Sequence, residues 1–309
     1  MALLAAKILS GHEISAEIKA ELVVRVERLK EKDVKPSLLL IRVGEDPAST
    51  SYVKQKRKTA EALGIGSRVL ELPAHVEETT LLTVIGRGNA DPAFHGVLVQ
   101  LPLPSHISEA RVANAIRPLK DVDCFHPRNV GKLHMGDPYL IPCTPHGIQQ
   151  MLLRSGYEPA GRHIVICGRS NLVGRPLAAL LSQKNPRANA TVTLCHSGTP
   201  NLPRLTAQAD ILVSAIGSPG FIKPNMVRDG AVVIDVGVTR IDDPEAASGY
   251  RLVGDVDILS TDDDFATVPD KAAALTPVPG GVGPMTVTML MWNTVIAAER
   301  QLSRTGDLS

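Results

Sequence analysis

Tyr52 and Lys56 stand four residues apart in a short charged stretch, and together they could do acid–base chemistry. If the chain is helical after Pro47, residues at i and i+4 lie on one helix face, about 5–6 Å apart at Cβ. A phenol and an ammonium group would then point into the same space and could orient a water molecule or move a proton. Runs of charge more often mark the solvated face of a surface helix. That alternative applies to Lys56 as well as to its neighbours Lys54 and Lys58.

A glycine turn between a strand-like and a helix-like run could bind a phosphate. The apolar run His163–Cys167 predicts a buried strand, and it leads through Gly168-Arg-Ser-Asn-Leu-Val-Gly174 to an apolar helical segment, Leu177–Leu181. Glycine lets the backbone approach a pyrophosphate, and the amino end of the following helix offers unpaired N–H groups. Arg169 and Ser170 stand where the usual G-x-G-x-x-G pattern has a further glycine. A plain tight turn is therefore the alternative.

The end of the next predicted strand indicates which dinucleotide would bind. An acidic residue there suits the ribose 2′-hydroxyl of NAD, whereas a cationic or hydroxyl side chain suits the 2′-phosphate of NADP. The strand ends in Cys195-His-Ser197 without an acidic residue, and Arg169 could pair bidentately with a phosphate. This pattern favours NADP over NAD. Gly217 and the glycine before Val238 also follow strand-like runs, which suits a close approach of the ribose and the nicotinamide.

Composition excludes several other classes of function. The formal net charge is +1, from 33 basic and 32 acidic residues, so no global field would recruit nucleic acid or an anionic membrane. Aromatic residues make up 3% of the chain, too few for base-stacking platforms. No apolar run reaches the length of about 18 residues that indicates a membrane span. The first ten residues lack the features of a signal peptide. We therefore expect a cytoplasmic protein with no nucleic-acid or membrane partner.

The cysteines and histidines predict neither disulfides nor a metal site. Cys124, Cys143, Cys167 and Cys195 form no C-x-x-C pair, and the last two fall in apolar runs, which is typical of reduced, buried thiols. The nine histidines are scattered, with no pair at metal-ligand spacing. We therefore expect no bound metal.

Strand-like and helix-like segments alternate along the chain, which predicts parallel sheets covered by helices. In the first half the expected strands are 37–43, 67–72 and 96–101, and the expected helices are 15–30, 51–63 and 77–87. In the second half the expected strands are 163–167, 191–195, 211–215 and 231–236, after a helix over 144–156. A chain of 309 residues is long enough for two domains. The predicted fold class is α/β.

Five short motifs follow one another along nearly the whole chain. They are Val43-Gly-Glu-Asp-Pro-Ala-Ser49 with Tyr52 and Lys56, Val99-Gln-Leu-Pro-Leu-Pro104, Lys120-Asp-Val-Asp123, Gly168-Arg-Ser170 with Val173-Gly174, and Thr276-Pro-Val-Pro-Gly-Gly-Val-Gly-Pro-Met-Thr286. In this order they resemble the bifunctional methylenetetrahydrofolate dehydrogenase/cyclohydrolase family. The resemblance implies an N-terminal α/β folate-binding catalytic domain (1–145 with 286–309), a Rossmann-type NADP-binding domain (146–285) and a cleft between them. It also implies a homodimer.

The resemblance implies two successive reactions on a small-molecule folate substrate. A hydride leaves the methylene bridge of 5,10-methylenetetrahydrofolate for C4 of the nicotinamide of NADP, which leaves the methenyl cation. Water then adds to that carbon, and the ring opens to 10-formyltetrahydrofolate. Because the methenyl carbon is already electrophilic, the second step mainly needs a positioned water and a group that accepts or shuttles a proton.

The resemblance assigns the catalytic roles to Lys56, Tyr52, Gln100 and Asp123. Lys56 would act on the proton, as a base or as a cation, and Gln100 would hold its ammonium. Tyr52 would stack on the folate rings and orient water, and Asp123 would accept paired hydrogen bonds from the pterin. The implied folate-binding residues are Ser49, Tyr52, Gln100, Leu101, Pro102, Asp123, Pro279, Gly280 and Gly281. The implied cofactor-binding residues are Gly168, Arg169, Ser170, Val173, Gly174, Ser197, Gly217 and Val238.

The chain departs from the family pattern at a few positions. Cys124 stands where glycine is usual, so a residue with a Cβ occupies a position that tolerates φ > 0, and we expect the loop that holds Asp123 to sit slightly differently. Val238 stands where isoleucine is more common. The stretch 184–190 is expected to be a small surface insertion, and 262–264 a solvated turn or helix start.

Three other interpretations compete with this one. Tyr-x-x-x-Lys is also the catalytic pair of short-chain dehydrogenases, but there it follows the dinucleotide motif, whereas Tyr52 precedes Gly168. A monofunctional dehydrogenase of the same family would not need Lys56, Gln100 and Asp123 for the water step. A non-catalytic nucleotide-binding module is hard to reconcile with two intact sets of site residues.

Overall fold

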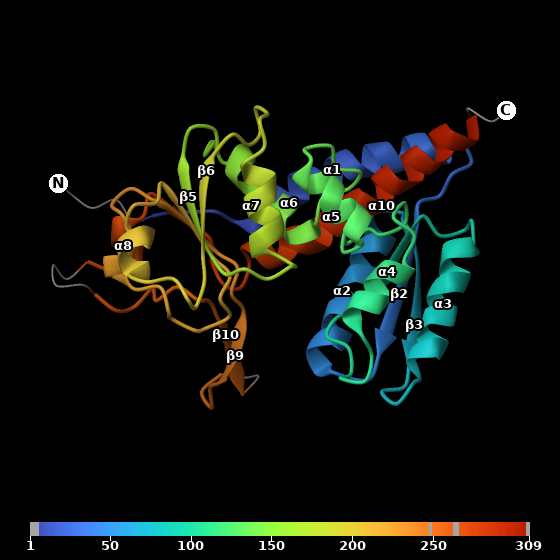
Figure 1. Ribbon diagram of the computed structural model, residues 1–309, viewed down its shortest axis with the longest axis horizontal. Coiled ribbons are helices and arrows are strands. Elements are labelled where there is room, and N and C mark those ends of the chain that lie inside the picture. The colour runs from blue at the N-terminus through green and yellow to red at the C-terminus, as the bar shows by residue number, and fades with distance from the viewer. Residues whose placement is uncertain (1–5, 247–248, 262–265, 307–309) are drawn as a thin grey trace. The chain divides into compact units, whose positions relative to one another are not determined.

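The computed structural model describes residues 6–246, 249–261 and 266–306, and the chain divides into two compact units, each with its own parallel sheet (Figure 1). The unit of residues 16–143 with 287–309 contains Lys56, and we call it the Lys56 unit. The unit of residues 1–15 with 144–286 is called the Gly168 unit. The α/β fold class is confirmed, while the cleft stays a prediction.

The Lys56 unit contains a three-stranded parallel sheet in the order β3-β2-β4. Its strands are β2 (Ser37–Val43), β3 (Gly66–Leu72) and β4 (Gly96–Val99). The helices that contribute residues to it are α1 (Gly11–Lys30), α2 (Pro47–Ala62), α3 (Glu78–Ala90), α4 (Glu109–Ala115), α5 (Pro127–His134) and α10 (Val282–Gly306). The central strand β2 is buried from Leu38 to Val43, as expected for a parallel strand covered on both faces.

The Gly168 unit contains a six-stranded sheet in the order β1-β11-β8-β7-β5-β6, with every neighbouring pair parallel. The strands are β1 (Lys7–Ile8), β5 (His163–Cys167), β6 (Thr191–Cys195), β7 (Ile211–Ser214), β8 (Val232–Asp235) and β11 (Ala274–Leu275). The helices are α6 (Cys143–Arg154), α7 (Gly174–Leu181), α8 (Leu202–Thr206), α9 (Val268–Lys271) and the 3₁₀ turn η1 (Pro224–Met226). A separate antiparallel hairpin joins β9 (Thr239–Asp242) to β10 (Tyr250–Val253).

Most predicted elements are present, and their shifted ends have local causes. Helix α2 begins at Pro47, four residues before the predicted start, because the Asp46 carboxylate accepts the Ser49 N–H (2.7 Å) and proline suits the first turn. Strand β4 ends at Val99 rather than residue 101, because Pro102 has no N–H with which to continue the ladder.

Residues 6–15 group with the Gly168 unit. There Lys7 and Ile8 pair with Ala274 and Leu275 at the edge of the six-stranded sheet. The resemblance places this stretch in the catalytic domain, and that domain assignment stays a prediction. Such two-residue strands are too short to show an alternating pattern, so the sequence analysis missed both β1 and β11. The hairpin β9–β10 was missed as well.

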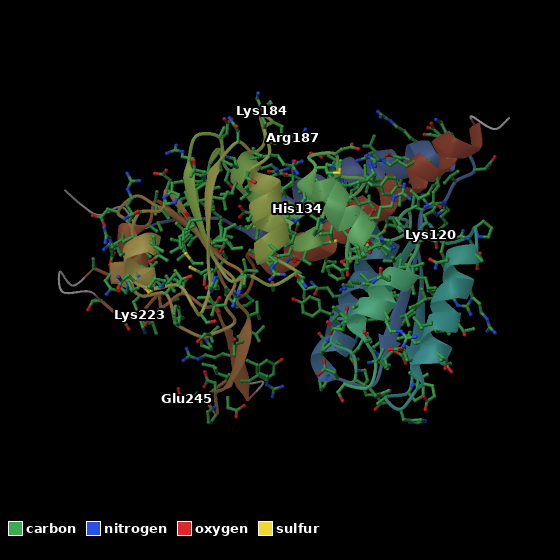
Figure 2. The ribbon with its side chains drawn as sticks, in the orientation of Figure 1. Lys120, His134, Lys184, Arg187, Lys223 and Glu245 are labelled. Carbon is green, nitrogen blue, oxygen red and sulfur yellow. The ribbon has the colours of Figure 1, made fainter. Side chains whose placement is uncertain are left out.

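Two predicted loops have different outcomes. The stretch 184–190 forms turns after α7, with Lys184 and Arg187 exposed (Figure 2) and Ala188 buried beneath them. It is therefore a surface loop with one apolar anchor. The predicted turn at 262–264 lies outside the described residues.

Cys124 keeps the backbone conformation that glycine favours. Its φ is +64°, in the left-handed region, and its side chain is buried (1% exposed). The left-handed conformation costs an L-residue about 1–2 kcal/mol. The loop therefore contains a strained residue. Burial of its side chain offsets part of the free-energy cost of that strain.

We expect Cys124→Gly to be more stable than Cys124→Ala, by about 1 kcal/mol. Both variants lose the thiol, but only glycine relieves the strain. Urea unfolding of the two variants measures the difference. The matched pair at Cys167, in the middle of the sheet at a non-positive φ, should show the usual order, with alanine the more stable. If Cys124→Ala were more stable than Cys124→Gly, the backbone strain assigned to residue 124 would be refuted.

Among the helices of the described residues, none is long and apolar enough to span a membrane.

Candidate active site

Helix α2 places Lys56 on its buried face. Ser49, Val53, Lys56 and Ala60 follow a helical spacing and are all buried, and Lys56 is only 7% exposed. Lys54 and Lys58 of the same charged run, by contrast, are exposed. The burial of one lysine among solvated neighbours identifies Lys56 as the unusual residue of the run.

Lys56 is held by the amide of Gln100. Its Nζ donates to Oε1 of Gln100 at 2.9 Å, and Nε2 of Gln100 donates to the carbonyl of Leu101 at 2.7 Å. The second hydrogen bond fixes which way the amide faces, because its NH₂ group is used by a carbonyl and its oxygen is left for the ammonium. The predicted hydrogen bond between Lys56 and Gln100 is confirmed.

Ser49 and Tyr52 both precede Lys56 along α2. Tyr52 is one turn before Lys56 and is 38% exposed, so its ring is available to a ligand. Ser49 is buried, and its Oγ lies 3.5 Å from the carbonyl of Leu101. The peptide bond from Leu101 to Pro102 is cis. The segment after β4 therefore meets α2 at both Ser49 and Lys56.

The thiol of Cys143 lies beside the segment that holds Asp123. Cys143 was not among the predicted site residues. Cys143 is buried, and its thiol donates to the carbonyl of Val122 (3.4 Å), the residue before Asp123. Burial raises the pKa of Cys143 well above its usual value; the charge of Asp123 raises it further, and the Lys56 ammonium lowers it. The charges of Asp123 and Lys56 therefore both act on this one buried sulfur.

The segment before Asp123 is anchored by a buried carboxylate, Asp121. It accepts hydrogen bonds from the His126 N–H (2.9 Å), the Phe125 N–H (3.2 Å) and the Asn129 amide (2.8 Å). Burial raises the pKa of Asp121 to about 6, against the effect of these donors. Asp121 therefore orders the turn that holds Asp123.

Two further side chains fix the same segment. Lys120 is buried and donates to the carbonyls of Gly88 (3.1 Å) and Asp91 (2.6 Å) at the carboxyl end of α3 (Figure 2). Asn293 of α10 is also buried and donates from Nδ2 to the carbonyls of Val122 (2.7 Å) and Ile141 (2.8 Å). Asn293 therefore ties the residue before Asp123 to the segment that leads to Cys143.

These residues meet because their segments leave one edge of one parallel sheet. Helix α2 follows β2, Gln100 follows β4, and Asp121 forms a parallel bridge with Val97 of β4. Parallel strands end at the same edge, which is where open α/β sheets bind their ligands. The Lys56 unit therefore holds Ser49, Tyr52, Lys56, Gln100, Leu101, Pro102 and Asp123 along its carboxyl edge.

The glycine turn of the Gly168 unit is tightly packed. A Cβ on Gly168 (φ +119°) would lie 2.2 Å from the carbonyl oxygen of Ala215, and a Cβ on Gly174 would lie 1.8 Å from the carbonyl oxygen of Gly168. Helix α7 thus starts directly against the end of β5, as expected for Gly174. Ser170 supports the turn by accepting the N–H of Val173 (3.1 Å) on its Oγ. The glycine turn is therefore a closely packed junction between β5, the loop after β7 and the start of α7.

The other predicted cofactor residues lie at the same edge of this sheet. Arg169, Ser197, Gly217 and Val238 follow β5, β6, β7 and β8 in turn, and all four are exposed. The chain passes from β5 outward to β6 and then returns to β7 on the other side of β5. A ligand is expected at such a switch point, beside Gly168. Their contact with a cofactor stays a prediction.

We expect Gly174→Ala to destabilise the protein by about 1–3 kcal/mol or more and to weaken dinucleotide binding, because its methyl group has no room against Gly168. Gly86→Ala in α3 is the matched control. A Cβ there meets nothing within 4 Å, so this helical glycine should be replaced with a gain of up to about 1 kcal/mol. Thermal unfolding and NADP titration measure both variants. Equal behaviour of the two would contradict the close packing at residue 174.

The three remaining folate-binding candidates belong to the Gly168 unit. Pro279, Gly280 and Gly281 form the turn before α10, the peptide bond before Pro279 is cis, and the carbonyl of Gly280 accepts the N–H of Gly11 (2.9 Å). A Cβ on Gly11 would lie 1.7 Å from the Gly281 oxygen, so α1 starts in contact with this turn. Its role in folate binding stays a prediction.

Within the described residues, no group of three His, Cys, Asp or Glu side chains could hold a metal ion. The four cysteines are all free and buried.

Comparison with known proteins finds two domains of one family along the chain. The catalytic domain of tetrahydrofolate dehydrogenase/cyclohydrolase matches residues 9–123, and the NAD(P)-binding domain of the same family matches residues 142–302. The chain is 55% identical over 298 residues to the bifunctional protein FolD of Dehalococcoides mccartyi strain CBDB1, covering 96% of this chain and 98% of that protein.

Two solved structures are similar over nearly the whole chain. The bifunctional FolD enzyme of Campylobacter jejuni is 42% identical with a TM-score of 0.87, covering 96% of this chain and 100% of that one. The Trypanosoma brucei methylenetetrahydrofolate dehydrogenase-cyclohydrolase, complexed with NADP and an inhibitor, is 40% identical with a TM-score of 0.89, covering 97% and 99%. The chain belongs to the tetrahydrofolate dehydrogenase/cyclohydrolase family, as its motifs predicted.

Proposed function

We propose that this protein catalyses both reactions of its family. It oxidises 5,10-methylenetetrahydrofolate to the methenyl compound with NADP, and then hydrolyses that compound to 10-formyltetrahydrofolate. The observation that supports both activities is the buried Lys56–Gln100 pair, close to Asp123, in a chain that also holds the packed glycine turn. A monofunctional dehydrogenase would not need the Lys56–Gln100 pair for a water step. A non-catalytic nucleotide-binding module would not need that pair either.

Lys56 is the group we propose for the water step. The Gln100 amide holds its Nζ by one hydrogen bond, which leaves two of the three ammonium protons for a substrate oxygen or a water. Its burial strengthens any interaction with charge that develops during addition of water to the methenyl carbon. We propose that Tyr52, which is exposed one turn away, stacks on the folate and orients the same water.

Asp123 is the residue we propose for recognition of the pterin. A carboxylate can accept two parallel hydrogen bonds from an amino-pyrimidinone edge, as it does from a guanidinium. Asp121, Lys120 and Asn293 fix the segment on both sides, so the carboxylate needs little reordering when substrate binds. Ser49, Leu101 and Pro102 complete the proposed contacts.

NADP is the proposed hydride acceptor in the first step. The proposed pyrophosphate site is the turn from Gly168 to Gly174, because a glycine turn between the end of a strand and the start of a closely packed helix is where this kind of fold binds a pyrophosphate. Arg169 and Ser197 are exposed at the ends of β5 and β6, where a 2′-phosphate is held in this kind of fold. The complex of the Trypanosoma brucei relative with NADP supports the same choice.

The wild-type protein tests the function directly. Incubation with methylenetetrahydrofolate and NADP should give the methenyl compound, followed by its absorbance, and then the formyl compound, separated by chromatography. NAD should support the first step poorly. Absence of any product with either dinucleotide would favour the non-catalytic alternative, and methenyl that accumulates without formyl product would favour the monofunctional one.

We propose that the protein is a homodimer in the cytoplasm. The hairpin β9–β10 is a two-stranded sheet on its own, and such a hairpin is only marginally stable without a covering partner. This supports a subunit contact there. The four buried, free cysteines support a reducing compartment. Light scattering during gel filtration measures the mass, and a monomer at micromolar concentration would contradict the dimer.

A further inference from the structure

A fully buried carboxylate lies against the loop that follows β7. Asp255 is 0% exposed and accepts a hydrogen bond from the hydroxyl of Ser214 (3.0 Å). It also accepts the backbone N–H groups of Ile216 (2.8 Å), Gly217 (3.2 Å) and Ser218 (2.9 Å). Three consecutive amides therefore converge on one side chain. We propose that Asp255 is a positioning residue for the dinucleotide, because it holds the 216–218 loop in the shape that the cofactor meets.

A second buried carboxylate extends this arrangement to the end of β8. Asp235 accepts the N–H groups of Gly237 (3.0 Å), Asp255 (3.0 Å) and Val256 (2.9 Å). Glycine is needed on both sides: a Cβ on Gly237 would lie 2.2 Å from an oxygen of Asp255, and a Cβ on Gly254 would lie 1.9 Å from an oxygen of Asp235. The two acids thus tie the ends of β7 and β8 to the segment after the hairpin.

The loop that Asp255 holds lies where a dinucleotide is expected. Ala215, at its start, is the residue whose carbonyl oxygen would lie 2.2 Å from a Cβ on Gly168, so the loop abuts the glycine turn. Ile216 is 37% exposed and Val238, after β8, is 49% exposed. Such exposed apolar side chains at the carboxyl edge suit the ribose and nicotinamide. Asp255 itself is too deeply buried to touch a ligand, so its action must pass through the loop.

Hydrogen bonds to a carboxylate are stronger than those between neutral groups. The four hydrogen bonds to Asp255 give the loop one well-defined shape before the cofactor binds. Less conformational entropy is then lost when the cofactor binds. This inference rests on the proposed function, since it assumes that the Gly168 unit binds NADP. It adds a role for a residue that makes no contact with either reactant.

Asp255→Asn tests the proposal with little change in volume. One oxygen accepts the Ser218 N–H and the other accepts the remaining three donors, so an amide must set its NH₂ group against at least one donor. We expect the KM for NADP to rise about tenfold, with a matching loss of kcat/KM for hydride transfer. Hydrolysis of added methenyltetrahydrofolate should stay at the wild-type rate, because Lys56 belongs to the other unit.

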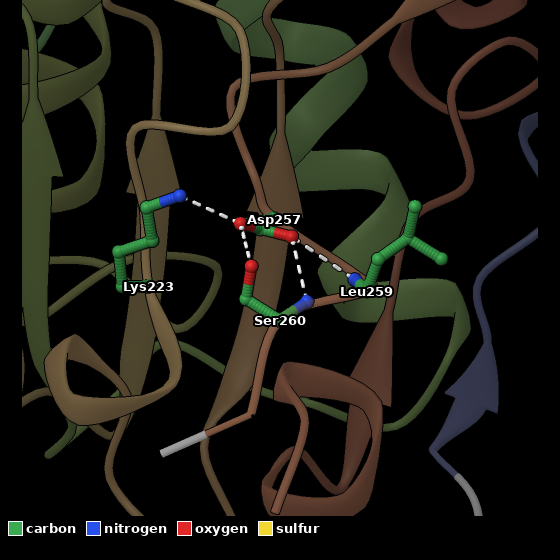
Figure 3. A network of polar contacts seen from close by, with 4 residues as sticks. All are labelled: Lys223, Asp257, Leu259 and Ser260. Atoms are coloured by element: carbon green, nitrogen blue, oxygen red, sulfur yellow. Dashed lines mark hydrogen bonds and ion pairs between the residues drawn. The ribbon is translucent and has the colours of Figure 1, made fainter.

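Asp257→Asn is the matched control, two residues further along the same segment. Asp257 accepts hydrogen bonds from Lys223 (2.6 Å), Ser260 (2.6 and 3.0 Å) and the Leu259 N–H (3.0 Å), in a separate polar network (Figure 3). Its replacement should lower the melting temperature without changing the KM for NADP. An equal rise in KM for both variants would overturn the specific role of Asp255.

Two other results would also overturn the proposal. One is an Asp255→Asn protein with a lower melting temperature and an unchanged KM for NADP, which would make the carboxylate purely structural. The other is an equal loss of hydride transfer and methenyl hydrolysis. If this variant does not fold, Ser214→Ala removes one donor and leaves the carboxylate in place, and it should raise the KM for NADP about two- to threefold. No rise would count against the proposal. Wild-type protein without hydride transfer would instead refute the proposed function.

Discussion

Replacing Lys56 by methionine is expected to lower the rate of methenyltetrahydrofolate hydrolysis by about 10²–10⁴-fold, the usual contribution of a group that acts on a proton. Methionine keeps most of the length and the buried stem but has no ammonium. The carbonyl oxygen of the Gln100 side chain then loses its 2.9 Å donor, and the water has no cationic partner. Hydride transfer should fall less, because that step moves no proton through this site.

A matched lysine on the same helix gives the control. Lys58 is exposed, so Lys58→Met should leave both activities unchanged and separate the effect of position from that of charge. The measurement is the initial rate of methenyl loss, with the substrate added directly. If Lys56→Met hydrolysed its substrate at nearly the wild-type rate, the proposed role of Lys56 would be wrong.

Replacing Arg169 by alanine is expected to weaken NADP binding by about 10–100-fold and to leave NAD binding nearly unchanged. The guanidinium is exposed after β5, next to the glycine turn, and no acidic residue follows β6 to favour a 2′-hydroxyl instead. A bidentate pair with the 2′-phosphate would be lost with NADP, while NAD has no such group. Isothermal titration with each dinucleotide measures the two affinities.

Arg162→Ala is the control for charge alone. Arg162 is also exposed, but it precedes β5, at the opposite edge of the same sheet. Arg162→Ala changes the net charge by the same amount as Arg169→Ala. It should leave the affinities for NADP and NAD unchanged. Equal losses of NADP and NAD affinity in Arg169→Ala would refute the 2′-phosphate assignment and leave only a general effect on the turn.

Local sequence patterns were sufficient to predict most helices and strands. They were also sufficient to predict which nearby residues share one helix face. The apolar runs at 37–43 and 163–167 have the boundaries that their patterns predicted, because a buried parallel strand is a nearly continuous run of apolar residues. The helical spacing of Tyr52 and Lys56 was also visible along the chain. Which lysine of the run is buried could be decided only with the family motifs, because the run itself is uniformly charged.

The supporting residues could not be predicted, because their partners are distant in sequence. Cys143 bonds to the carbonyl of Val122 across 21 positions, and Asn293 reaches the same carbonyl across 171. Asp255 looks like an ordinary loop aspartate until its four donors are known.

The central claim is that one chain performs hydride transfer and water addition with two separable sets of residues. The most direct measurement is the ratio of the two initial rates in Lys56→Met and in Arg169→Ala, followed from methylenetetrahydrofolate with NADP and from added methenyl compound. The ratio of hydride transfer to hydrolysis should rise in Lys56→Met and fall in Arg169→Ala at limiting NADP. A ratio that stays at the wild-type value in both variants would contradict the claim.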